Sequence, residues 1–332
     1  MADGEDRGIG SIADLVTPMA VRVAATLRVA DHLAGGVRTA RELAAVTGAD
    51  AGVLERVLRH LVTVEVFSRD AQGRYGLLPR GEELRDGHPS GVRRRLDAET
   101  ALGRGDLAFV ALLHSVRTGE AAYPRHYGRS FWEDLRADPK RTADYDAEMG
   151  TDAAAWAEAV VPAFDWGTLG RIVDVGGGNG TLLAALLTAY PEMRGTVFDQ
   201  PETVRAARAA LAAAGLADRG DAMAGDFFGA LPSGADGYVL SAILHDWDDD
   251  AARTILRRCA EAAGTHGRVL VVERVGADGE SVHTGMDLRM LVYFGARERG
   301  VAELAELAAG AGLRVAGVHQ AGDLAVVEMV AA

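Results

Sequence analysis

The chain of 332 residues contains one cysteine, Cys259, and almost no lysine. A single cysteine excludes an intrachain disulfide and a zinc site built on cysteines. Cys259 lies in an amphipathic helical pattern, so we interpret it as a core residue. We expect no apolar run long enough to span a bilayer, and the acidic, glycine-rich N-terminus lacks the pattern of a signal peptide. We therefore expect a cytoplasmic protein.

Positive charge is also scarce relative to negative charge. The net charge is -13 and the isoelectric point about 5.2, which argues against nucleic acid or an anionic membrane as the main partner. With 48% hydrophobic and 25% charged residues, the composition is that of a soluble globular protein. The length allows more than one domain.

The N-terminal third has a helical pattern followed by a hairpin pattern. Apolar spacing predicts a long helix over 12–33. Thr39 and Asp50 are placed to cap two shorter helices. We expect the second of these to bury Val53, Leu54, Val57, Leu58 and Leu61. Runs at 66–69 and 74–78 around a turn predict a β-hairpin, so the whole segment has the pattern of a winged helix.

A winged helix raises the possibility of a transcription regulator. The second capped helix carries Arg56, Arg59 and His60, but Asp50 and Glu55 as well. It lacks the basic face of a helix that contacts phosphates. We therefore interpret this segment as a dimerisation module, in which helices at 12–33 and 92–118 exchange apolar faces between two copies.

Strand and helix patterns alternate from residue 166 onward, which predicts a doubly wound parallel sheet. The last two strands, 313–319 and 324–330, are separated by four residues. That gap allows an antiparallel hairpin and excludes a parallel crossover. We predict a dimerisation domain at 1–95, a helical linker at 96–165 and a ligand-binding domain at 166–332. Strands are expected at 171–175, 195–199, 221–224, 236–241 and 268–273, and helices at 180–189, 202–214, 249–263, 284–294 and 301–310.

The first strand of this domain ends in an acid and a glycine cluster, DVGGGNG at 174–180. Glycine lets a backbone approach a ligand closely, and a helix that follows presents free N–H groups. The spacing of Gly176, Gly178 and Gly180 differs from that of pyrophosphate-binding loops, and Asp174 suits an amine or a ribose hydroxyl. A turn without a ligand and a dinucleotide fold remain alternatives.

Other polar residues close the following strands. Asp199 is placed to bind ribose hydroxyls or to cap the next helix. After Gly225, Asp226 and Phe227 suit an adenine amine and ring, and Ser241 is placed to line the same cleft.

The motif LHDW at 244–247 places a histidine at the end of the fourth strand. The ordinary pKa of histidine suits proton transfer near neutrality. Glu273 and Glu298 are candidates to orient His245, and a purely structural histidine is the alternative. The acids Asp246, Asp248, Asp249 and Asp250 raise the possibility of Mg²⁺, but acids at a helix start also offset its dipole. We expect no metal.

Taken together, these segments resemble the S-adenosylmethionine (SAM)-dependent small-molecule O-methyltransferases, a group that includes plant caffeate- and flavonoid-type enzymes and actinobacterial antibiotic-tailoring enzymes. The resemblance extends along essentially the whole chain. It implies an α/β fold, with a Rossmann-like sheet whose last strand is antiparallel and a mainly α-helical winged-helix dimerisation domain. It further implies SAM as cofactor, S-adenosylhomocysteine as product and a homodimer. The matching segments are 174–180, 198–201 (FDQP), 225–227 (GDF), 244–247, 272–273 (VE) and 297–299 (RER).

The resemblance also implies a set of site residues. His245 is the expected general base, held by Glu273 and Glu298. The expected cofactor residues are Asp174, Gly176, Gly178, Asp199, Gly225, Asp226, Phe227 and Ser241. The expected acceptor residues are Trp132, Met149, Asp246, Met286, Asp287, Met290, Phe294 and Arg297.

The expected activity is methylation of a hydroxyl group on an aromatic secondary metabolite in antibiotic biosynthesis. We expect this hydroxyl to be phenolic. Some relatives with this fold bind SAM yet catalyse hydroxylation, decarboxylation or pericyclic steps, and others methylate nitrogen or carbon. These reactions remain alternatives. The sequence leaves the acceptor scaffold and the methylated position open.

Overall fold

The computed structural model describes residues 8–277 and 280–332. The chain folds as two compact units that divide between Leu107 and Ala108. The segment predicted as a linker, 96–165, is thus split between the two units. The domain boundaries at 95 and 165 stay predictions.

The first unit is helical with one small hairpin. Thr39 and Asp50 cap α4 and α5 as predicted, and β1 pairs with β2 in an antiparallel hairpin. The elements are α1 (Ile9–Ala13), α2 (Val16–Thr26), α3 (Val29–Ala34), α4 (Ala40–Thr47), α5 (Ala51–Thr63), β1 (Phe67–Arg69), β2 (Tyr75–Leu77), α6 (Pro79–Glu82), α7 (Val92–Leu96) and α8 (Ala101–Leu107).

Both long helices predicted in this part of the chain are wrong. The helix predicted over 12–33 is divided into α1, α2 and α3. Arg28 adopts a left-handed conformation with φ of 51°, which a continuing helix excludes. The helix predicted over 92–118 is interrupted after α7, where the Thr100 hydroxyl donates to the carbonyls of Arg94 and Asp97. Side-chain bonds of this kind compete with a helical backbone.

Burial in α5 follows the predicted stripe with one exception. Leu54, Leu58 and Leu61 are buried and Val57 is half-buried, but Val53 is 57% exposed because it lies at the edge of the stripe.

The N-terminal helices α1 and α2 and the link between them carry a row of exposed apolar side chains. Its members are Ile9, Ile12, Leu15, Val16, Met19 and Val23. By length and composition the stretch Ile9–Thr26 passes as a membrane span, so the expectation that no apolar run reaches that length is wrong. This stretch is divided between two helices, since α1 ends at Ala13 and α2 begins at Val16.

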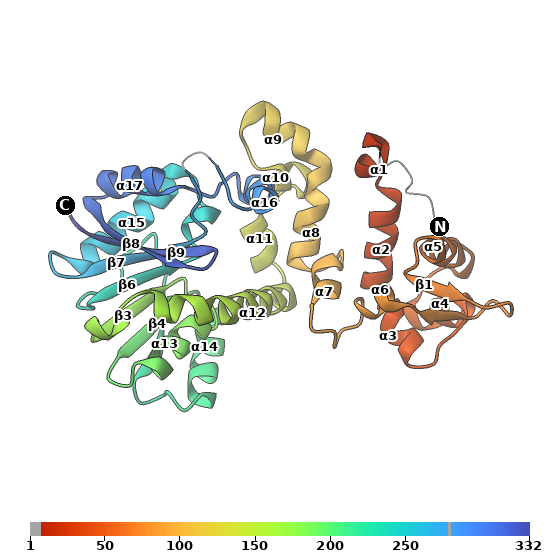
Figure 1. Ribbon diagram of the computed structural model, residues 1–332, viewed down its shortest axis with the longest axis horizontal. Coiled ribbons are helices and arrows are strands. Elements are labelled where there is room, and N and C mark those ends of the chain that lie inside the picture. The colour runs from red at the N-terminus through yellow and green to blue at the C-terminus, as the bar shows by residue number, and fades with distance from the viewer. Residues whose placement is uncertain (1–7, 278–279) are drawn as a thin grey trace. The chain divides into compact units, whose positions relative to one another are not determined.

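The second unit contains the sheet (Figure 1). Its helices are η1 (Ala108–Ala111), α9 (Leu112–Thr118), α10 (Ala122–Tyr127), α11 (Phe131–Arg136), α12 (Pro139–Ala163), η2 (Trp166–Thr168), α13 (Thr181–Ala189), α14 (Pro201–Ala213), η3 (Leu244–Asp246), α15 (Asp249–Ala263), α16 (Thr284–Phe294) and α17 (Val301–Gly310). Its strands are β3 (Arg171–Val175), β4 (Arg194–Asp199), β5 (Gly220–Ala224), β6 (Gly237–Ser241), β7 (Arg268–Glu273), β8 (Leu313–Ala321) and β9 (Leu324–Ala331).

The seven strands lie in the order β5-β4-β3-β6-β7-β9-β8. The first five are parallel, and β9 pairs antiparallel with both β7 and β8. This confirms the predicted fold class, including the final hairpin. The strands of that hairpin are longer than predicted, so that only Gly322 and Asp323 separate them.

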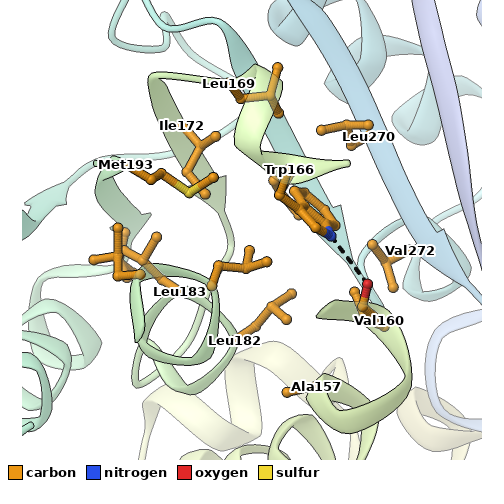
Figure 2. Close-up of a cluster of buried hydrophobic side chains, with 14 of the residues drawn as sticks. Ala157, Val160, Trp166, Leu169, Ile172, Leu182, Leu183, Met193, Leu270 and Val272 are labelled. Carbon is orange, nitrogen blue, oxygen red and sulfur yellow. Dashed lines mark hydrogen bonds between the residues drawn. The ribbon is translucent and has the colours of Figure 1, made fainter. Parts of the chain in front are cut away.

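Helices cover both faces of the sheet, because alternate strand residues point to opposite sides. In Figure 1, α12, α13 and α14 lie on one face and α15 and α17 on the other. Cys259 lies on the buried face of α15 and is fully buried, which confirms its interpretation as a core residue. On the first face, Trp166 is fully buried and its indole N–H donates to the Val160 carbonyl at 3.1 Å (Figure 2).

The connections on either side of the neighbouring strands β3 and β6 leave the sheet on opposite faces. The chain passes from β3 into α13 on one face and from β6 into α15 on the other. A parallel sheet of this kind has a crevice at the carboxyl ends of the two strands where the connections diverge. The glycine cluster and the LHDW motif follow those two strands.

Candidate active site

The loop after β3 requires glycine at three positions. Gly176, Gly178 and Gly180 have φ values of 70°, 58° and 79°, a region in which other residues are strained. A Cβ atom at Gly176 would also lie 2.5 Å from the side chain of Ile243, which follows β6. The loop therefore follows a path that only glycine permits, and it leads into the N-terminus of α13.

Asp174 is a buried acid without a partner. It is 2% exposed, and neither carboxylate oxygen has a hydrogen-bond partner among the described residues. A Cβ atom at Gly177 would lie 2.5 Å from its Cγ, so glycine there makes room for the carboxylate. Burial, and then the charge of Asp199, raise the pKa of Asp174 to about 7. Since an unpaired buried polar group is costly, a ligand that donates hydrogen bonds here would relieve that cost.

Asp199, at the end of β4, lies next to the same loop. Its carboxylate accepts hydrogen bonds from the backbone N–H groups of Gly178 at 2.9 Å and Gln200 at 2.7 Å. Burial raises its pKa in spite of these two bonds.

A third carboxylate, Asp146 of α12, completes this acidic cluster. It accepts a hydrogen bond from the Thr203 hydroxyl at 3.2 Å. Burial, and then the charge of Asp199, raise its pKa to about 6. The sequence analysis missed Asp146, because nothing in a helical pattern shows that α12 passes the end of β4. The cluster suits a ligand with hydroxyl or cationic groups.

The other predicted cofactor residues have the following contacts. A Cβ atom at Gly225 would overlap the ring of Phe198, which accounts for the glycine by packing. Asp226 is exposed, and its carboxylate accepts from the Phe228 N–H at 2.9 Å. Phe227 is half-buried against Trp247, and Ser241 is half-buried at the end of β6. A role for these four in cofactor binding stays a prediction.

His245 lies in the short turn η3 and is fixed by one carboxylate. Its Nδ1 lies 2.9 Å from an oxygen of Glu273, the last residue of β7. The other Glu273 oxygen accepts from the backbone N–H groups of Ile243, Leu244 and His245 at 3.1, 2.9 and 3.4 Å. Glu273 thus holds both the imidazole and the turn that carries it, and with the proton on Nδ1 the atom Nε2 is left as the base.

The charges around His245 determine its protonation. Burial lowers its pKa, but the negative charges of Glu273 and Asp246 outweigh burial and raise the pKa to about 9. Asp246 lies 3.5 Å from Nε2. Burial raises the pKa of this acid to about 7, although His245 opposes the shift. In the protein without ligands, His245 is therefore protonated at neutral pH.

Glu298, the second predicted partner of His245, does not contact the imidazole within the described part of the chain. One of its carboxylate oxygens accepts from the Ser281 hydroxyl, and the other is buried with no partner in residues 8–277 and 280–332. Its backbone N–H donates to Asp287 at 3.0 Å. Glu298 acts on His245 only through its charge, which contributes to the raised pKa.

Three nearly parallel aromatic rings lie beside the motif. Trp132 of α11 stacks on Phe294 of α16 at 5.1 Å and on Trp247 at 6.0 Å between ring centroids. The Trp132 indole N–H is buried and has no hydrogen-bond partner among the residues that the structure describes. Two predicted acceptor residues, Trp132 and Phe294, thus belong to one aromatic group with Trp247. The sequence analysis included Trp247 in the LHDW motif but predicted no role for it.

The remaining predicted acceptor residues differ in their surroundings. Met290 is buried on α16, a helix that packs against η3, while Met149, Met286 and Asp287 are half-buried. Arg297 is exposed, and its guanidinium is ion-paired with Asp249 and Glu303. Its surface ion pairs do not favour a role in acceptor binding, so that role stays a prediction.

Arg299 is a site residue for which the sequence analysis predicted no role. Its side chain is 2% exposed and donates to the carbonyls of Leu244 and Trp247, both at 2.7 Å, and to Asp249 at 2.8 Å. The residue belongs to the quoted segment 297–299, but only the tertiary structure brings it to η3.

The acids that suggested Mg²⁺ have other contacts. Asp248 caps α15 by accepting from the Ala251 N–H, Asp249 pairs with Arg299, and Asp250 pairs with Arg253. Among the residues that the structure describes, no group of three potential ligands is arranged to hold a metal.

The comparisons with known proteins agree with this geometry. Residues 109–314 match the model of the O-methyltransferase domain, and residues 11–84 match that of the O-methyltransferase dimerisation domain. The chain belongs to the O-methyltransferase family. This confirms the family that the sequence motifs predicted.

Individual relatives are similar over nearly the whole chain. A 2,7-dihydroxy-5-methyl-1-naphthoate 7-O-methyltransferase of Streptomyces carzinostaticus is 56% identical over 98% of this chain and 97% of its own length. Aclacinomycin 10-hydroxylase RdmB of Streptomyces purpurascens is 44% identical over 94% of this chain and 85% of its own. The structure of NcsB1, an O-methyltransferase from neocarzinostatin biosynthesis solved with SAM and 2-hydroxy-5-methyl naphthoic acid, has a TM-score of 0.93. It is 54% identical and covers 99% of this chain and 100% of its own.

Proposed function

We propose that this protein transfers a methyl group from SAM to a hydroxyl of an aromatic acid in antibiotic biosynthesis, with His245 as the general base. The observation that carries the proposal is the fixation of His245 by Glu273 at the sheet edge where the glycine loop and Asp174 also lie. The naphthoate O-methyltransferase at 56% identity and the SAM complex of NcsB1 support the reaction and the cofactor.

The fit of the site to SAM rests on its acids. A bound SAM supplies a methyl group already activated by a positively charged sulfur. Asp174 offers two unpartnered carboxylate oxygens to an ammonium or hydroxyl group. Asp199 is placed for ribose hydroxyls, and the positive-φ glycines keep the backbone clear of side chains beside them. Asp146 adds negative charge, which favours a cationic ligand.

In the proposed reaction His245 removes the proton from the acceptor hydroxyl. The hydroxyl oxygen then forms its bond to the methyl carbon, the bond from that carbon to sulfur breaks, and the proton remains on Nε2. Glu273 stabilises the resulting imidazolium through Nδ1. A base of this kind contributes about 10²–10⁴ in rate, and alignment of the two substrates contributes about 7–11 kcal/mol.

The base must be neutral before the reaction begins. Because the pKa of His245 is about 9 in the protein without ligands, a positive charge bound nearby assists by lowering it. We therefore expect binding of SAM to release a proton from the protein near neutral pH.

We propose a hydroxylated naphthoate or a similar flat aromatic acid as the acceptor class. The name of the relative at 56% identity supports this choice. The nearly parallel rings of Trp132, Phe294 and Trp247 suit a flat body, and the unpartnered Trp132 indole N–H suits an oxygen acceptor on it.

The test is an incubation with methyl-labelled SAM and 2,7-dihydroxy-5-methyl-1-naphthoate. We expect labelled methyl ether and an equal amount of S-adenosylhomocysteine. His245→Ala should lower kcat about 10²–10⁴-fold and leave the affinity for SAM nearly unchanged. Full activity in that variant would show that alignment alone suffices and that His245 is not the base.

Hydroxylation is a second candidate, because RdmB is 44% identical to this chain. The pairing of His245 with Glu273 favours methyl transfer, since a hydroxyl acceptor must lose a proton. The two reactions are separated by their products. A hydroxylated product without S-adenosylhomocysteine would replace the proposed methyl transfer.

We also propose that the protein is a homodimer in the cytoplasm. The match to the dimerisation domain supports the dimer. The row of exposed apolar residues on α1 and α2, and exposed Val110, Leu113 and Val116 in the second unit, are candidate contact surfaces. If this surface is covered by a second copy of the chain, the apolar character of Ile9–Thr26 is explained by the dimer contact and no membrane is needed to explain it.

A further inference from the structure

Glu273 and Arg299 both bind the backbone of the turn η3, Glu273 at its N–H groups and Arg299 at its carbonyl groups. Three N–H groups at 243–245 donate to Glu273, while the carbonyls of Leu244 and Trp247 accept from Arg299. The backbone that carries His245 therefore lies between a carboxylate and a guanidinium. Each charge interacts favourably with the peptide dipoles that point toward it, and hydrogen bonds to charged groups are stronger than neutral ones.

The turn needs such support because its entry is strained. Ala242, between β6 and the turn, has φ of 53°, a left-handed conformation that a residue with a side chain rarely adopts. Without the flanking charges, this segment has other conformations available that would move the imidazole.

Arg299 is itself held in place. Its Nε and one Nη atom donate to Asp249 at 3.0 and 2.8 Å. On its two chain neighbours, the N–H of Glu298 donates to Asp287 and the N–H of Gly300 donates to Glu303. These contacts fix the position of the guanidinium that binds the carbonyls of Leu244 and Trp247.

We propose that Arg299 is a positioning residue for the proposed methyl transfer. By holding the carbonyls of Leu244 and Trp247 it fixes the place of His245, and it touches neither substrate. The proposal rests on the function proposed above. A displacement of a reacting group by about 1 Å lowers a rate about 10²-fold, so loss of the guanidinium should lower kcat about 10- to 100-fold.

The test uses the full chain with three substitutions. Arg299→Gln removes the charge, and Arg299→Lys keeps the charge but replaces the planar two-carbonyl contact with one ammonium. Arg253→Gln is the matched control, because Arg253 lies on α15 and pairs on the surface with Asp250. The measurements are kcat and KM with 2,7-dihydroxy-5-methyl-1-naphthoate, the pH profile of kcat, calorimetric affinity for SAM and the melting temperature. A spectrum of protein labelled with ¹⁵N-histidine reports on the Nδ1 proton of His245.

We expect Arg299→Gln to lose about 10- to 100-fold in kcat with the affinity for SAM within about twofold of the unchanged chain. The Nδ1 signal of His245 should shift or broaden and the pH profile of kcat should move. Arg299→Lys should restore part of each effect, and Arg253→Gln should match the unchanged chain. If Arg299→Gln does not fold, Arg299→Lys decides the question by the same measurements.

The proposal is overturned if the variant that folds keeps its kcat, its pH profile and the His245 signal, even with a lower melting temperature. That result would show that Arg299 only connects the N-termini of α15 and α17 and does not position His245. Failure of the proposed function gives a different result. If His245→Ala is fully active while Arg299→Gln still shifts the histidine signal, the contact to the turn stands and the role of His245 as base does not.

Discussion

Replacement of Asp174 by asparagine should stabilise the protein and weaken its binding of SAM. The carboxylate is buried with no hydrogen-bond partner in the described part of the chain, and its pKa is raised from 3.8 to about 7. A group with a raised pKa destabilises the folded state progressively as the pH rises from the unfolded to the folded value. At about 1.36 kcal/mol for each pKa unit, this amounts to about 4 kcal/mol above pH 7 and less than half of that at pH 5.

The comparison between two pH values isolates the charge. The amide of asparagine has its own desolvation cost, but that cost does not change with pH. The advantage of Asp174→Asn should therefore be larger at pH 8 than at pH 5 by about 2–3 kcal/mol, which is a difference of about 5–10 °C in melting temperature. Asp218→Asn, a change at an exposed acid, should show no such dependence.

Thermal melting at pH 5 and pH 8, with and without SAM, provides the measurement. We expect SAM to raise the melting temperature of the unchanged protein much more than that of the variant. Equal effects of Asp174→Asn at the two pH values would refute the assignment of a buried, unpaired charge. An unchanged affinity for SAM would refute its role in binding the cofactor.

Four further outcomes are expected. The kcat/KM for SAM, which reports on the enzyme without SAM, should rise with pH toward about 9 because only the neutral form of His245 accepts a proton, and a profile that is flat from pH 6 to 9 would contradict the role of this histidine. Glu273→Gln should move this rise to lower pH, since it removes a charge that raises the pKa, and should lower kcat roughly 10²–10⁴-fold. Asp199→Ala should weaken the binding of SAM in calorimetry with little effect on kcat at saturation. Leu113→Asp should shift the protein toward a monomer in light scattering, whereas Val318→Asp on the outer strand β8 should not.

The sequence alone determined the framework of the second unit. Alternating strand and helix patterns predicted the order of its elements, and several boundaries, such as β3, β7, α15 and α16, match the structure. This succeeded because a buried parallel strand and an amphipathic helix each have a local apolar period. Asp174, Asp199 and Glu273 could be named because each lies at the carboxyl end of its strand, and His245 because it follows β6 by a few residues. Such ends meet at one edge of the sheet.

Tertiary structure decided which of these residues touch. Glu273 contacts His245 directly whereas Glu298 acts only by its charge, and Arg297 lies on the surface whereas Arg299 reaches the turn. The division of the predicted helix over 12–33 was also visible only in the structure, because the left-handed conformation of Arg28 does not alter the apolar spacing of the sequence. Contacts between segments distant in the chain depend on packing geometry, and the period of a single segment carries no information about its neighbours in space.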